Sequence, residues 1–69
     1  RREVKPLAIT LKAARVNKNL SQSAAAKLIG VSESMLSKWE NGKAFPSTKR
    51  IPKILDAYGV KYDDLIFLP

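Results

Sequence analysis

Apolar residues recur along this chain at the three- and four-residue spacing of short amphipathic helices, and glycine or proline separates most of these stretches. The first stretch follows Pro6, whose missing N–H costs nothing in the first turn of a helix. Its apolar members are Leu7, Ala8, Leu11 and Ala14. The spacing predicts a first helix that begins near residue 7 and weakens at the asparagine-rich residues 17–19.

Two further helices are predicted on either side of Gly30. Ser21 is a good N-cap for a helix over residues 22–29, because its hydroxyl can accept a hydrogen bond from an otherwise unpaired backbone N–H. This helix is rich in alanine, which favours helix formation and permits a neighbouring helix to approach closely. Gly30 can adopt the left-handed conformation that ends a helix. Ser32 then caps a third helix, which ends near Asn41.

Two more helices are expected in the last third of the chain. Ser47 can cap a fourth helix, but Pro52 removes a helical hydrogen bond and crowds the preceding turn. The fourth helix therefore either kinks or begins near Pro52, and it closes at Gly59. Two aspartates at residues 63–64, followed by apolar residues 65–68, predict a short fifth helix.

These stretches together describe one small all-α domain. Residues 7–69 are expected to form a compact bundle of about five short helices, after a basic and partly disordered segment over residues 1–6. A domain of 69 residues is only marginally stable alone. The chain has no cysteine and no histidine, so neither disulfides nor the usual zinc ligands can stabilise it.

The predicted third helix has two distinct faces. At about 100° per residue, its polar residues fall within an arc of roughly 140° and its apolar residues lie opposite. The polar arc holds Glu33, Ser34, Ser37, Lys38 and Asn41, and the apolar arc holds Met35, Leu36 and Trp39. An ordinary surface helix has the same pattern, but here a small-residue helix and a glycine turn precede it, as they do in a helix that enters the major groove of DNA. Trp39 is expected in the core, not against a base.

Charge is distributed unevenly along the chain. The formal net charge is +7, and 12 of the 13 basic residues lie at or before Lys53, against 3 of the 6 acids. Such a surface suits a polyanion, because neutralised phosphates release counterions. A basic surface that only confers solubility is also common, and charge alone leaves the two interpretations even.

Several classes of protein are disfavoured by what the chain lacks. An enzyme is not expected, because there is no histidine, cysteine, phosphate-binding glycine loop or pair of carboxylates in a cleft. No cofactor, metal or small-molecule ligand is expected either. No apolar run approaches the ~20 residues that span a bilayer, and a cytoplasmic protein is expected.

Residues 20–42, LSQSAAAKLIGVSESMLSKWENG, carry a family resemblance. This segment resembles the helix-turn-helix of lambda-repressor-like domains of the Cro/C1 type, also called the XRE family. The residues that carry the resemblance are Leu11, Arg15, Leu20–Gln22, Ala26, Gly30–Ser32, Leu36, Trp39–Gly42, Pro46, Ser47 and Tyr58–Val60. The resemblance extends from about Ile9 to Phe67, and it implies that the second and third helices form the DNA-binding motif.

The resemblance implies which residues read bases. The family's base-reading positions match Glu33, Ser34 and Lys38, and Ser37 is a weaker candidate for a base or a phosphate. Glu33 can accept a hydrogen bond from cytosine N4, and Lys38 can donate to guanine O6 or N7. Glu33 has an alternative role, which is only to stabilise the positive start of its helix.

Phosphate contacts are implied on both sides of the groove. Gln22 matches the family's phosphate-contacting glutamine, and backbone N–H groups beside Ser21 point at the sugar–phosphate chain. Asn41 and Lys43 match positions that hold the opposite backbone; alternatively, Asn41 simply ends its helix and Lys43 is solvated. The basic residues of segment 1–5 either follow the duplex as an arm or are disordered.

The resemblance also implies an internal ion pair between Arg15 and Glu40. Glu40 lies at the border between the two arcs of the third helix, where an acid near phosphates is unfavourable without a cationic partner. The planar fork of an arginine suits a carboxylate. The alternative is that Arg15 contacts a phosphate and Glu40 is solvated.

Two functions are compatible with these observations. The resemblance implies a bacterial or phage regulator of transcription, with repression favoured, bound as a homodimer to a palindromic double-stranded DNA operator with half-sites about 34 Å apart. The alternative is a protein-binding module of the same fold, such as an antitoxin or an adaptor subunit. Leu65, Ile66 and Phe67 either contribute to self-association or close the core.

Overall fold

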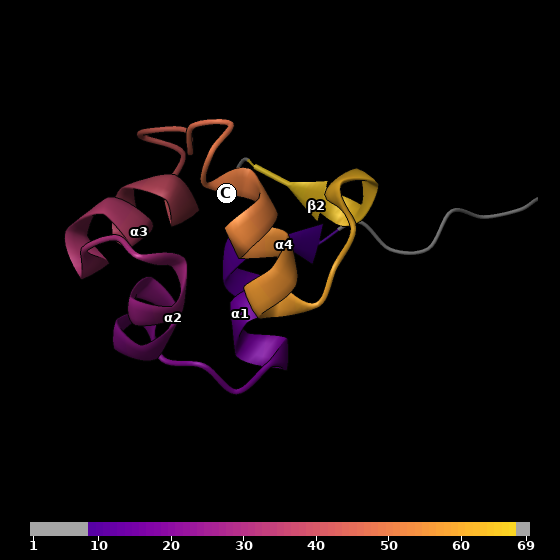
Figure 1. Cartoon of the computed structure of the whole chain (residues 1–69), viewed down its shortest axis with the longest axis horizontal. Helices are drawn as coiled ribbons and strands as arrows, with labels where there is room; N and C mark the ends of the chain where they lie inside the picture. Colours follow the sequence, from indigo (N-terminus) through magenta and orange to yellow (C-terminus); the bar gives the residue numbers. More distant parts are fainter. Residues whose placement is uncertain (1–8, 68–69) are drawn as a thin grey trace, which may run out of the picture.

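Four short helices pack around a small core, and a minimal parallel sheet closes the side of the molecule that faces away from the third helix (Figure 1). The structure is a computed structural model, and it describes residues 9–67. Its elements are β1 (Ile9–Thr10), α1 (Leu11–Asn17), α2 (Gln22–Ile29), α3 (Glu33–Glu40), α4 (Ile51–Tyr58), the 3-10 turn η1 (Tyr62–Asp64) and β2 (Leu65–Ile66). The fold is all-α in class, as predicted, with four α-helices and not five among residues 9–67.

The helix-turn-helix forms where local sequence preferences are strong. The Ser21 hydroxyl accepts a hydrogen bond from the backbone N–H of Ala24 at 3.0 Å. The Ser32 hydroxyl accepts the backbone N–H of Met35 at 3.1 Å. Each cap stabilises its helix by about 1 kcal/mol. Between the two helices, Gly30 has φ +89°, and a Cβ there would lie 3.2 Å from Nη1 of Arg50, so the turn favours glycine through both backbone strain and space.

The start of the first helix differs from the prediction. Helix α1 begins at Leu11, because Thr10 is extended and its hydroxyl accepts the backbone N–H of Ala13 at 3.1 Å. Thr10 and Ile9 form β1, which a helical spacing of apolar residues cannot distinguish from a first helical turn. The predicted helical residues 7–8 and the basic segment 1–6 lie outside the described residues.

The predicted fifth helix is wrong. The two aspartates belong to η1, and the chain then extends as β2, which pairs in parallel with β1 in the register Ile9↔Leu65 and Thr10↔Ile66. Burial alternates along this strand: Leu65 is buried and Ile66 is exposed, which is the two-residue period of a strand. Residues 68–69 lie outside the described part of the chain.

Pro52 marks the start of α4, which was one of the two expected alternatives. The helix begins at Ile51 with the proline in its first turn, where the missing N–H has no intrahelical partner to lose. Ser47 provides no side-chain cap; its carbonyl accepts the backbone N–H groups of Arg50 and Ile51. Helix α4 ends at Tyr58, and Gly59, which has φ +66°, forms its C-cap.

The core draws side chains from all four helices and from β2. Its members are Leu11, Ala14, Ala25, Ala26, Ile29, Leu36, Trp39, Ile54, Tyr58 and Leu65. The alanines of α2 are small enough for α3 and α4 to pack closely against that helix. Trp39 is 3% exposed, so its predicted place in the core is confirmed. Within the described residues, no helix is long and apolar enough to cross a membrane.

Candidate nucleic-acid interface

The outer side of α3 is polar and open to solvent. Glu33, Ser34 and Lys38 are exposed, and Ser37 is half-buried. The opposite side of the same helix carries Leu36, which is fully buried. The packing of the inner side therefore fixes which side chains a ligand in front of α3 would meet.

Glu33 also lies in the first turn of α3, next to the cap at Ser32. A carboxylate there interacts favourably with the positive end of the helix. Both expected roles of Glu33, stabilising the helix start and contacting a base, are therefore compatible with its position.

Met35 occupies a position that the two-face pattern assigned to the interior, yet it is 38% exposed. It lines a hollow of about 270 Å³ with Trp39, Phe45 and Arg50, beside the loop that follows α3. A helical wheel reports direction around one helix only, so it could not show that this loop leaves Met35 partly uncovered.

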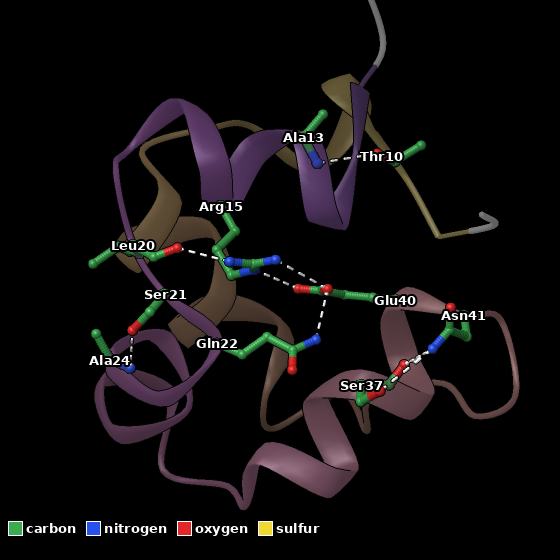
Figure 2. Close-up of polar contacts among 10 residues, drawn as sticks. All are labelled: Thr10, Ala13, Arg15, Leu20, Ser21, Gln22, Ala24, Ser37, Glu40 and Asn41. Atoms are coloured by element: carbon green, nitrogen blue, oxygen red, sulfur yellow. Dashed lines mark hydrogen bonds and ion pairs between the residues drawn. The ribbon is translucent and has the colours of Figure 1, made fainter.

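The end of α3 is held by local hydrogen bonds. The side-chain amide of Asn41 donates to the Ser37 carbonyl at 2.9 Å and approaches the Ser37 hydroxyl at 3.3 Å (Figure 2). The backbone N–H of Lys43 donates to the Lys38 carbonyl at 2.8 Å. Asn41 thus helps to end its helix, and both Asn41 and Lys43 remain exposed.

Arg15 and Glu40 form a buried ion pair between α1 and α3. Nε of Arg15 donates to Oε2 of Glu40 at 2.7 Å, and Nη2 approaches Oε1 at 3.4 Å. The third nitrogen, Nη1, donates to the Leu20 carbonyl at 2.7 Å, in the connection that leads into α2. The two side chains are 10% and 4% exposed. The guanidinium therefore ties α1 to both the start of α2 and the end of α3.

Gln22 also contacts this ion pair. The sequence predicted the pair itself but not the contact with Gln22. Its Nε2 donates to Oε1 of Glu40 at 3.0 Å, and its own oxygen is turned away from that carboxylate (Figure 2). We call Arg15, Gln22 and Glu40 the polar cluster. Ser21, the preceding residue, is exposed and caps α2.

Tyr58 packs close to the polar cluster from α4. Its side chain is 1% exposed, and its hydroxyl has no hydrogen-bond partner among the described residues. The pKa of Tyr58 is raised from 10.0 to about 12, chiefly by burial and also by the charge of Glu40, while the charge of Arg15 lowers it.

Positive charge dominates the surface around the motif. Residues 21–53 carry six basic side chains and two acids, Glu33 and Glu40. Glu40 is buried against Arg15, so Glu33 is the solvent-exposed acid of this segment. An anionic ligand would therefore meet a mostly cationic surface with one carboxylate at the start of α3.

A second exposed feature lies between the loop after α3 and the end of the chain. Phe45, Tyr62 and Phe67 form what we call the aromatic surface: the Phe67 ring centroid lies 6.4 Å from that of Phe45 and 5.8 Å from that of Tyr62. Phe45 is 69% exposed and Tyr62 is 56% exposed. With Pro46 and Ile51, the three rings line a hollow of about 200 Å³.

Comparison with known proteins places these features in context. A helix-turn-helix family model matches residues 11–65. The chain is 36% identical over 52 residues to the HTH-type transcriptional activator BcrR of Enterococcus faecalis, covering 75% of this chain and 26% of that protein. It is 34% identical over 56 residues to the antitoxin PezA of Streptococcus pneumoniae, covering 81% and 35%.

A phage protein is similar as well. The ImmF control region 10 kDa protein of Bacillus phage phi105 is 42% identical over 50 residues, covering 72% of this chain and 56% of that protein. The matched segment thus spans from about a quarter to just over half of the length of these relatives. No solved structure matches the chain.

Proposed function

This chain belongs to the Cro/C1-type helix-turn-helix family, and we propose that it is a sequence-specific regulator of transcription that binds double-stranded DNA through α3. The observation that carries the proposal is the exposed polar side of α3, presented by Glu33, Ser34 and Lys38 on a helix whose other side is locked into the core. The family is one of DNA-binding regulators and not of enzymes.

Base readout requires side chains that match the edges of base pairs in the major groove. Lys38 is suited to guanine, Glu33 to the amino group of cytosine, and Ser34 to several bases. Ser37 is half-buried and fits a supporting contact to a base or a phosphate. The carboxylate of Glu33, the exposed acid of residues 21–53, contributes selectivity, because its repulsion by phosphates is offset only where a cytosine amino group is in reach.

Phosphate contacts on both flanks would hold α3 in the groove. We assign one flank to Ser21 and Gln22 at the start of α2, where backbone N–H groups are available, and the other to Asn41 and Lys43. These contacts carry no sequence information. Their loss would weaken binding to every duplex and reduce its dependence on salt.

We further propose that the protein represses transcription as a homodimer on a palindromic operator, with half-sites about one helical turn (~34 Å) apart. A second copy is supported by the aromatic surface, since Phe45 and Tyr62 leave much apolar area in water. Leu65 is 8% exposed and closes the core, so only Ile66 and Phe67 of the last described stretch remain for contact with a partner.

Selection from a random duplex library tests the proposal directly, because it reports half-site, spacing and symmetry together. Lys38→Ala should then relax the preference at one base pair and cost about 1–3 kcal/mol on the selected site. Lys27→Ala, an exposed lysine of α2, is the matched control and should leave that preference intact. If Lys38→Ala instead lowered the affinity for all DNA sequences equally, Lys38 would be a phosphate contact. If the selection enriched no sequence, specific binding would be contradicted.

The aromatic surface and the similarity to an antitoxin favour one alternative, a module that holds a partner protein. Mobility-shift assays with random DNA at low and moderate salt separate the two functions. A DNA-binding regulator shifts the duplex at low salt and loses affinity steeply as salt rises. A module that only binds protein gives no shift in either condition.

A further inference from the structure

Gln22 has two roles for its side-chain amide: the proposed contact with a phosphate, and a hydrogen bond to Glu40 that only the structure reveals. As a proposed phosphate contact it must offer an N–H, because a phosphate oxygen only accepts hydrogen bonds. Yet its Nε2 already donates to Oε1 of Glu40 at 3.0 Å. The inference below rests on the proposed DNA binding and adds a residue that determines how one DNA contact is made.

The chemistry of the amide permits both contacts. A side-chain amide carries two N–H groups, and an ionised carboxylate is an acceptor only, so Glu40 can engage just the nitrogen end of Gln22. This contact sets which end of the amide faces the carboxylate and leaves the second N–H available. Among the described residues, the Gln22 side chain makes no other hydrogen bond. The side chain is half-buried, at the first residue of α2.

The carboxylate can do this only because it is held rigidly itself. Arg15 occupies both oxygens of Glu40, and the side chain of Glu40 is 4% exposed. The same guanidinium fixes the Leu20 carbonyl, two residues before Gln22. The Leu20 carbonyl before α2 and the Gln22 side chain at its start are thus both connected to Glu40 at the end of α3, the first through Arg15 and the second directly.

We propose that Glu40 is a positioning residue for DNA: it touches no nucleic acid, but it orients the Gln22 amide so that the free N–H donates to a phosphate beside the start of α2. Without the carboxylate, the amide rotates among its conformers and loses the contact for much of the time. The start of α2 and the end of α3 flank the reading helix, so Glu40 also sets the spacing between the two phosphate contacts.

Scanning the selected half-site with single methylphosphonates tests the proposal, since each replacement removes the charge of one phosphate. For the unaltered protein, replacing the phosphate beside the start of α2 should weaken binding about 10-fold, as expected for a lost hydrogen bond to a charged group. In Gln22→Ala that penalty should vanish. In Glu40→Gln, where Gln22 is still present, it should fall to about 2–3-fold, because a neutral amide both donates and accepts and no longer fixes which end of the Gln22 amide faces it.

Leu65→Ala controls for stability, because it weakens the core at β2 and lies outside the polar cluster. Leu65→Ala should keep the full 10-fold penalty. If Glu40 had only a structural role, Glu40→Gln and Leu65→Ala would show the same penalty. A full penalty in Glu40→Gln overturns the proposal. The proposal is also overturned if no position that is sensitive in the unaltered protein loses its penalty in Gln22→Ala. In both cases the selected site would still be bound, which separates this failure from failure of the proposed function.

Nuclear magnetic resonance of the unaltered protein gives an independent test if Glu40→Gln does not fold. In the free protein, the side-chain amide proton of Gln22 that faces Glu40 should exchange with solvent more slowly than the other one. On addition of the selected duplex, one of them should shift strongly and the other should keep its contact with Glu40. Equal shifts of both protons, or none, would contradict the proposal.

Discussion

The polar cluster and the aromatic surface lie on the same small scaffold and are built in opposite ways. In the polar cluster, charged and amide groups are withdrawn from water, and Arg15, Gln22 and Glu40 satisfy one another within hydrogen-bond distance. In the aromatic surface, Phe45 and Tyr62 are more than half exposed, although apolar rings gain most by leaving water. One region satisfies its polar groups within the chain, and the other leaves apolar rings in water.

The two regions therefore differ in what their contacts determine. The polar cluster fixes how helix ends are arranged within the chain, whereas the aromatic surface leaves apolar area that contact with another molecule would bury. A buried ion pair adds little net stability compared with apolar packing, but losing one member is costly, so it enforces one arrangement of the helix ends. An open apolar surface enforces no arrangement inside the chain, and its free energy is available for association. Changes to the polar cluster should therefore alter folding, and changes to the aromatic surface should alter assembly.

The largest effect is expected from breaking the ion pair. Arg15→Met and Glu40→Gln should each lower the free energy of unfolding by about 3–5 kcal/mol, because each leaves a buried partner unsatisfied. The double variant should cost less than the sum of the two. Chemical denaturation of the three variants measures the coupling.

Lys12→Met is the matched control, since Lys12 lies on α1 and is exposed. It should change stability by no more than about 0.5 kcal/mol. Strict additivity of the Arg15 and Glu40 effects would show that the pair does not interact, and the contrast between the two regions would then disappear.

A smaller effect is expected from Tyr58 at alkaline pH. Its pKa is raised from 10.0 to about 12 in the folded chain. Below pH 10 the phenol is neutral in both states. Between pH 10 and 12 the unfolded chain loses the proton and the folded chain retains it, so stability should fall by about 1.4 kcal/mol per pH unit.

Tyr58→Phe should remove this contribution and make the alkaline loss of stability less steep, whereas Tyr62→Phe, on the exposed surface, should follow the unaltered protein. Since the buried hydroxyl of Tyr58 has no partner among the described residues, its removal should also cost little at neutral pH. Denaturant titrations across this pH range decide the point, and parallel losses in all three proteins would refute it.

The smallest effect on folding is expected at the aromatic surface. Phe45→Ser removes a ring that is 69% exposed and should change the free energy of unfolding by less than about 0.5 kcal/mol. Sedimentation of the unaltered protein should show concentration-dependent association that this variant loses. Val16→Ser, exposed at the end of α1, is the control and should associate normally. A monomer at every concentration would leave dimerisation on DNA alone.

The helix-turn-helix was predictable because its boundaries depend on local chemistry. Ser21, Gly30 and Ser32 each have a strong preference for a helix end, and they place α2 and α3 with the observed bounds. The identity of the family followed from the same residues. The base and phosphate contacts stay predictions, since they depend on a duplex and not on the chain alone.

The strands and the Gln22 contact could not be obtained in this way. Strands of two residues have no periodicity to detect, and Ile9 and Leu65 adopt extended backbone because they pair with each other across the fold. Gln22 and Glu40 are 18 residues apart, and their contact depends on how two helices are placed in space. The spacing of residues in a helix gives the direction of each side chain around the axis of that helix. It does not show which end of another helix packs against that side chain.

The pairing of β1 with β2 has a practical consequence for handling the molecule. Strands β1 and β2, which pair Ile9 with Leu65 near the two limits of the described chain, lie on the side of the molecule that faces away from α3 (Figure 1). A fluorophore or a surface tether attached beside either strand would therefore stand clear of the exposed side of α3. Because Ile66 of β2 is a proposed contact with a second copy, the attachment belongs beside β1, and single-molecule measurements should then report DNA-binding lifetimes that the label does not change.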